Sequence, residues 1–99
     1  MIFGKNMRGK IGINVKNLVY NFDLLKSKLP RGVLSAAVVK ADAYGHGERE
    51  VVKALESSAD YFVTATVEEA ERAREITAKP ILCLARVTGK EIERCILKK

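Results

Sequence analysis

The chain has 99 residues, enough for one small domain or for one section of a larger one. Hydrophobic residues make up 47% of it and charged residues 30%, a balance that excludes a disordered tail and a fibrous protein. No apolar run reaches the roughly 18 residues of a membrane span, and the first ten residues lack the apolar stretch of a signal peptide. We therefore expect a soluble, cytoplasmic protein without membrane contacts.

The two cysteines, Cys83 and Cys95, have neither paired spacing nor nearby histidines. A disulfide framework and a metal site are both unexpected, which agrees with a reducing cytoplasm.

The net charge of +6 is unevenly distributed. Residues 1–40 carry eight basic groups and one acidic group, whereas residues 41–99 carry ten basic and eleven acidic groups. A basic half is compatible with a small module that binds nucleic acid or another polyanion. The aromatic residues do not interleave with the basic ones as a base-stacking surface requires, so we favour solvated lysines over nucleic-acid binding.

The N-terminal third predicts a short strand and a helix after a flexible lead-in over residues 1–10. Apolar and polar residues alternate from Ile11 to Val15, the pattern of a half-buried strand. Asn17 is predicted to cap a helix that ends before Pro30 and Gly32. Its predicted buried stripe consists of Leu18, Phe22, Leu25 and Leu29.

Three strand–helix units are predicted to follow. The apolar runs 33–39, 61–65 and 81–85 predict strands, and the near-continuous run 33–39 predicts one covered on both faces. The intervening segment 41–47 is predicted to be a loop, and helical spacing follows over residues 48–59 through Val51, Val52 and Leu55.

Two further helices carry capping-box patterns at their starts, formed by Thr66 with Glu69 and by Thr88 with Glu91. The apolar residues of these helices are Val67, Ala70, Ala73 and Ile76 in the first, and Ile92, Cys95 and Ile96 in the second.

This alternation predicts an α/β fold of parallel strands joined by right-handed crossovers. A closed eight-stranded barrel needs about 250 residues. We therefore interpret residues 11–99 as the first part of a TIM-type (β/α)8 barrel, an incomplete domain truncated after about three barrel strands. Unpaired strand edges would also suit a self-associating scaffold.

Lys40 is the charged residue at the carboxyl end of the first long apolar run. Parallel sheets bind ligands at that end, and a partly desolvated amine suits covalent catalysis. Strands also end in lysine merely because they emerge into water. The following Tyr44-Gly45-His46-Gly47 offers a phenol and two glycines that let backbone approach a ligand. An ordinary turn, with His46 as a loop residue, remains the alternative.

Residues 37–47, AVVKADAYGHG, closely resemble the signature of the alanine racemases, which use pyridoxal 5′-phosphate (PLP). Residues 13–18, 65–70 and 80–84 are similar to neighbouring parts of the same family. The resemblance extends from about Gly12 to the last residue. Asp42 stands where many relatives have Asn.

The resemblance implies an isomerase of D-alanine biosynthesis that interconverts L- and D-alanine by two-base proton transfer. Lys40 would hold PLP as an aldimine and act as one base, and Tyr44 would hydrogen-bond the cofactor phosphate. Val38, Leu82 and Leu84 would line the cofactor cavity. The family forms dimers, and its opposing base lies in a later part of the chain, so we expect this fragment to be inactive alone. A serine racemase and a non-catalytic PLP-binding barrel protein are near alternatives.

Overall fold

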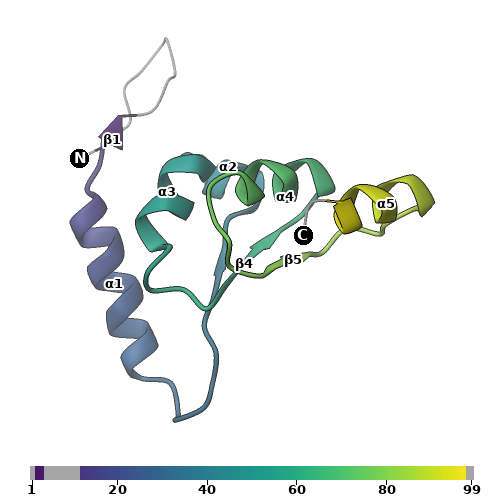
Figure 1. Cartoon of the computed structure of the whole chain (residues 1–99). Coiled ribbons are helices and arrows are strands. Elements are labelled where there is room, and N and C mark those ends of the chain that lie inside the picture. The colour runs from purple at the N-terminus through teal and green to yellow at the C-terminus, as the bar shows by residue number, and fades with distance from the viewer. Residues whose placement is uncertain (1, 4–11, 98–99) are drawn as a thin grey trace.

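The computed structural model describes residues 2–3 and 12–97 (Figure 1). The predicted flexible lead-in lies outside the described residues except at positions 2 and 3, which form a strand. In chain order the elements are β1 (Ile2–Phe3), β2 (Gly12–Ile13), α1 (Val15–Ser27), β3 (Ala36–Val38), α2 (Lys40–Tyr44), α3 (Glu48–Leu55), β4 (Tyr61–Thr64), α4 (Val67–Arg74), β5 (Ile81–Cys83) and α5 (Gly89–Leu97).

Strands β3, β4 and β5 form a parallel sheet in sequential order, as the alternation of apolar runs and helices predicts. Helices α2, α3 and α4 lie on one side of this sheet, above the strands in Figure 1. Because the three strands are parallel, their carboxyl ends share one edge of the sheet, which is where parallel α/β sheets carry their functional groups.

The core lies between the sheet and the helices. Ala37 and Phe62 are neighbours in the strand register, and both side chains are buried against the helical layer. Helix α3 contributes Val51, Val52 and Leu55, as its spacing predicts. In β3 the buried Ala37 lies between exposed Ala36 and Val38, as the alternation of strand side chains between the two faces of a sheet predicts.

The opposite face of the sheet has no helix packed on it in the described part of the chain. Val38, Leu82 and Leu84 expose 42%, 51% and 58% of their surface. The prediction that the 33–39 run is a strand covered on both faces is therefore wrong for this chain. Its first residues, Val33 and Leu34, precede β3 and are exposed.

The N-terminal elements correct two predictions. The strand predicted over 11–15 is restricted to Gly12–Ile13, which pairs antiparallel with β1 and not with the parallel sheet. Asn14, and not Asn17, caps α1, because its Oδ1 accepts the N–H of residue 17 at 3.1 Å. The two asparagines are three positions apart, so either could begin a helix by pattern alone.

The buried stripe predicted for α1 is confirmed only in part. Leu18 and Phe22 pack against the core, whereas Leu25 and Leu29 are exposed. The helix ends at Ser27, which leaves Leu29 beyond its last turn.

The capping boxes differ in completeness. At α4 the Thr66 hydroxyl accepts the N–H of Glu69, and the Glu69 carboxylate accepts the N–H of Thr66, so the predicted box is confirmed. At α5 the Glu91 carboxylate accepts both the N–H and the hydroxyl of Thr88, which is half of the predicted pattern. Ile92, one of the apolar residues of α5, is exposed.

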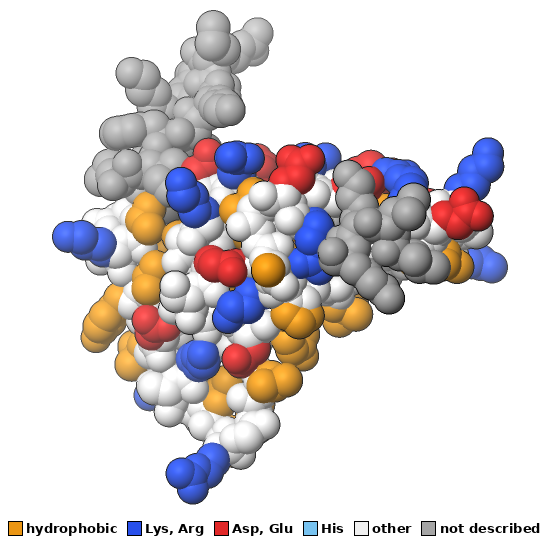
Figure 2. All heavy atoms as spheres, viewed as in Figure 1, with side chains coloured by type: hydrophobic (Ala, Val, Ile, Leu, Met, Phe, Trp, Pro, Cys, Tyr) orange, Lys and Arg blue, Asp and Glu red, His pale blue; other side chains and the backbone are white. Residues whose placement is uncertain are grey.

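Basic and acidic side chains intermix across the face drawn in Figure 2. Among the described residues, no helix has the length and apolarity to cross a membrane, and no group of acidic, His and Cys side chains has the arrangement of a metal site. Cys83 and Cys95 are free thiols.

Candidate functional site

Lys40 lies at the carboxyl end of β3, where the sequence predicts it. Val38 ends the strand, Val39 is fully buried, and Lys40 begins α2 with its side chain half-buried. None of the described acidic residues forms an ion pair with Lys40. Its amine is therefore available for a bond to a ligand.

The segment after Lys40 is a left-handed helical turn and not the predicted loop. Ala41, Asp42, Ala43 and Tyr44 have φ angles of 53°, 54°, 55° and 56°. The N–H of Gly45 closes the turn by donating to the carbonyl of residue 41 at 3.1 Å. Left-handed geometry costs non-glycine residues roughly 1–2 kcal/mol each, so contacts from the surroundings must hold this turn.

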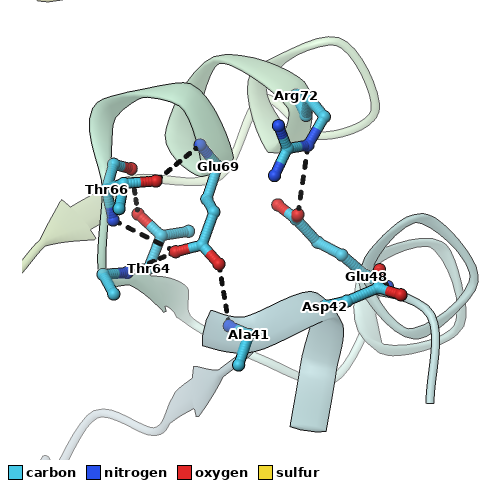
Figure 3. Close-up of polar contacts among 8 residues, drawn as sticks. Ala41, Asp42, Glu48, Thr64, Thr66, Glu69 and Arg72 are labelled. Atoms are coloured by element: carbon cyan, nitrogen blue, oxygen red, sulfur yellow. Dashed lines mark hydrogen bonds and ion pairs between the residues drawn. The ribbon is translucent and has the colours of Figure 1, made fainter. Parts of the chain in front are cut away.

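Glu69 supplies one such contact from the start of α4 (Figure 3). Its Oε2 accepts the N–H of Ala41 at 2.7 Å, and its Oε1 accepts the N–H groups of Ala65 at 2.8 Å and Thr66 at 3.1 Å. Burial alone would raise the pKa of this carboxyl, but the three backbone donors outweigh it and lower the pKa below its ordinary value. Glu69 is therefore held as a carboxylate.

Asp42 ties the turn to α3 on its other side. Its Oδ1 accepts the N–H of Glu48 at 2.8 Å, and its carbonyl accepts the N–H of Gly47 at 2.9 Å. The left-handed turn is thus linked both to the helix that follows it and to α4.

Glu48 is a buried carboxyl beside this turn. Its Oε2 lies 3.6 Å from Nε of Arg72, while its buried Oε1 has no hydrogen-bond partner among the described residues. Burial raises the pKa of Glu48; the charge of Arg72 opposes this effect, and the negative charges of Glu69 and Asp42 add to it.

Tyr44 closes α2 and is 61% exposed. Its hydroxyl forms no hydrogen bond with another described residue, so it remains accessible to a ligand. Lys40 and Tyr44 stand at the two ends of the same five-residue turn. The structure therefore places the amine and the phenol on one short element at one end of β3.

His46 has a local role. Its Nδ1 lies 3.0 Å from the carbonyl oxygen of Ala43, so the ring supports the turn that carries Tyr44. His46 and Tyr44 also border an apolar cavity of about 330 Å³ between α1 and β3, to which Leu18 and Phe22 contribute.

The three apolar residues predicted to line a ligand cavity share the uncovered face of the sheet. Val38 and Leu82 flank Val63 in the strand register, and Leu84 follows two residues after Leu82. Figure 2 shows several hydrophobic side chains along the lower side of the view. The structure thus brings Val38, Leu82 and Leu84 to one surface.

Sequence reasoning assigned Glu69 only a capping role and did not identify Glu48. The Thr66–Glu69 spacing signals the cap, but the bond to Ala41 joins residues 28 positions apart. A single sequence carries no local signal for such a contact.

A family model described as the N-terminal domain of alanine racemase matches residues 13–99. The chain belongs to the alanine racemase family. It is 45% identical over 78 residues to alanine racemase 2 of Caldanaerobacter subterraneus, covering 76% of this chain and 20% of that protein. It is 37% identical over 91 residues to an alanine racemase of Streptococcus pneumoniae, covering 91% and 24%.

Solved alanine racemase structures agree with this assignment. The crystal structure of alanine racemase from E. faecalis superposes with a TM-score of 0.82 at 34% identity, over 87% of this chain and 24% of that one. The Clostridium difficile 630 protein, in complex with cycloserine, gives 0.80 at 39% identity over 88% and 24%. The chain thus spans about a quarter or less of these alanine racemases, and the matches confirm the predicted first part of the barrel fold.

Proposed function

We propose that this chain is the N-terminal section of a PLP-dependent alanine racemase and that Lys40 carries the cofactor. The observation that supports this most is the position of Lys40: an amine without an acidic partner among the described residues, at the carboxyl end of β3, in a member of the alanine racemase family. Tyr44 lies on the same turn with its phenol exposed.

The residues present fit PLP chemically. The Lys40 amine would bind the cofactor aldehyde carbon through a C=N bond, with release of one water. The Tyr44 hydroxyl would donate a hydrogen bond to the phosphate. Bound PLP supplies an electron sink that stabilises negative charge at the substrate Cα.

The uncovered sheet face would exclude water from the cofactor. Val38, Leu82 and Leu84 are apolar, exposed in this chain and on the same surface, so burying them against a planar ring would be favourable. We propose that these three side chains contact PLP.

Once the amino group of alanine has replaced it on the aldehyde carbon, the freed Lys40 amine would move a proton at the Cα of alanine on one face. Inversion needs a second base on the opposite face, because a single base would return the proton to the side from which it came. The other tyrosines do not meet this need: Tyr20 lies on α1, and Tyr61 begins β4 at the end of the sheet away from Lys40. We propose that the second base lies outside this chain and that the complete enzyme is a homodimer.

Absorbance spectroscopy with PLP tests the proposal. A C=N bond to a lysine gives a yellow band, which we expect for the chain and for Lys53→Arg, an exposed control on α3. Lys40→Arg should lose most of the band. A band of undiminished intensity in Lys40→Arg would contradict the assignment of Lys40. We also expect the chain alone to racemise L-alanine no faster than PLP in buffer does.

A further inference from the structure

The Glu69 carboxylate bonds two different elements with its two oxygens. Oε1 accepts the N–H groups of Ala65 and Thr66, which is enough to complete the cap of α4. Oε2 is not needed for that cap and instead accepts the N–H of Ala41 at 2.7 Å. The second bond therefore serves the turn that follows β3.

The Ala41 N–H belongs to the peptide group that joins it to Lys40. The orientation of this peptide plane is set by ψ of Lys40 and φ of Ala41, and Ala41 is the first of the four left-handed residues. A short hydrogen bond to a charged acceptor fixes that plane more strongly than a bond to a neutral acceptor would. We propose that Glu69 is a positioning residue, which fixes the backbone at Lys40 so that its amine meets the PLP aldehyde; this inference rests on the proposed function of Lys40.

The arrangement requires a carboxylate. Both oxygens act as acceptors, whereas a glutamine amide offers one acceptor oxygen and would present an NH2 group to the other N–H. An aspartate side chain is one methylene shorter and could not reach both elements. The lowered pKa of Glu69 keeps both oxygens deprotonated at neutral pH.

The neighbourhood provides two matched controls. Thr66→Ala removes the hydroxyl that accepts the N–H of Glu69 at 3.1 Å, which weakens the same cap but leaves the bond to Ala41. Glu48→Gln removes another buried carboxylate, whose side chain pairs with Arg72 and not with the backbone of the turn.

The test compares the wild-type chain with Glu69→Gln and both controls. Two quantities are measured: hydrogen exchange at the Ala41 amide without PLP, and the rate at which the yellow absorbance band of the C=N bond at Lys40 forms with PLP. For Glu69→Gln we expect exchange about tenfold faster, as for loss of a charge-assisted bond, and a several-fold slower reaction. In Thr66→Ala and Glu48→Gln, the exchange rate and the reaction rate should both stay close to the wild-type values.

If Glu69→Gln matches Thr66→Ala in both quantities, the inference is overturned. A wild-type chain that protects the Ala41 amide but forms no bond at Lys40 would overturn the proposed function instead. Should Glu69→Gln not fold, the wild-type Ala41 amide shift is followed against pH by NMR. An Ala41 amide shift that changes with the titration of the Glu69 carboxyl supports the contact. An Ala41 amide shift that does not change with that titration overturns the inference.

Discussion

The backbone N–H of Ala41 donates to the carboxylate of Glu69 at 2.7 Å, although the two residues are 28 positions apart. Through this bond the turn that begins with Lys40 is tied to the start of α4, the helix of the next strand–helix unit. Neighbouring units of the barrel section are therefore joined by a specific polar contact as well as by the sheet and the shared core.

The left-handed turn predicts an unusual response to glycine. Ala41→Gly should raise the free energy of unfolding by about 0.5 kcal/mol, because relief of positive-φ strain outweighs the entropy that glycine adds to the unfolded chain. The control Ala54→Gly, in right-handed α3, should lower it by about 1 kcal/mol. Urea unfolding measures both, and equal losses would show that residue 41 is not left-handed.

Glu48→Gln should gain stability relative to wild type as the pH rises. The folded-state pKa of Glu48 lies above the ordinary value of 4.5, so folding favours its protonated form. The stability that the protonated Glu48 carboxyl contributes to the wild-type protein is fully present below pH 4.5. It is lost as the pH rises through the higher folded-state pKa. Urea midpoints between pH 4 and pH 7 measure the difference between the two proteins.

Glu69→Gln should show the opposite trend. Its folded-state pKa is lowered, so the stability that Glu69 contributes is present above pH 4.5 and is lost as the pH falls through the folded-state value. The free energy of unfolding of the variant should therefore drop further below that of wild type as the pH rises. If the stability of both variants relative to wild type changed in the same direction with rising pH, this would contradict the charge distribution described for this site.

The position of the first helix cap can be checked with two asparagines. Asn14→Ala should cost about 1 kcal/mol of unfolding free energy, because its side chain accepts a backbone N–H of α1. Asn17→Ala should cost much less, since Asn17 supplies only its backbone N–H to this cap. Chemical denaturation distinguishes them, and a larger loss for Asn17→Ala would restore the cap position expected from the sequence.

The parallel strand–helix order, the position of Lys40 and the Thr66–Glu69 cap could be predicted from sequence because each follows from local pattern. Apolar runs mark strands, and a Thr followed three residues later by Glu marks a helix start. The resemblance of residues 37–47 to the alanine racemase signature then identified the family, which the comparisons confirm.

The remaining features depend on contacts between distant residues. Ala41 and Ala43 have no intrinsic preference for a left-handed turn, so their conformation is imposed by surrounding contacts such as the bond to Glu69. The exposure of Val38 and Leu82 could not be read from apolar runs either, because such runs do not say which face of a strand receives a covering layer.

Site mapping tests the central claim most directly. The chain is incubated with PLP, reduced with sodium borohydride, digested and analysed by mass spectrometry, with lysine-by-lysine quantification of the reduced cofactor adduct. We predict that Lys40 carries most of the label at low PLP concentration and that exposed Lys53 carries little. Label spread evenly over the lysines, or concentrated at a lysine other than Lys40, would contradict the account.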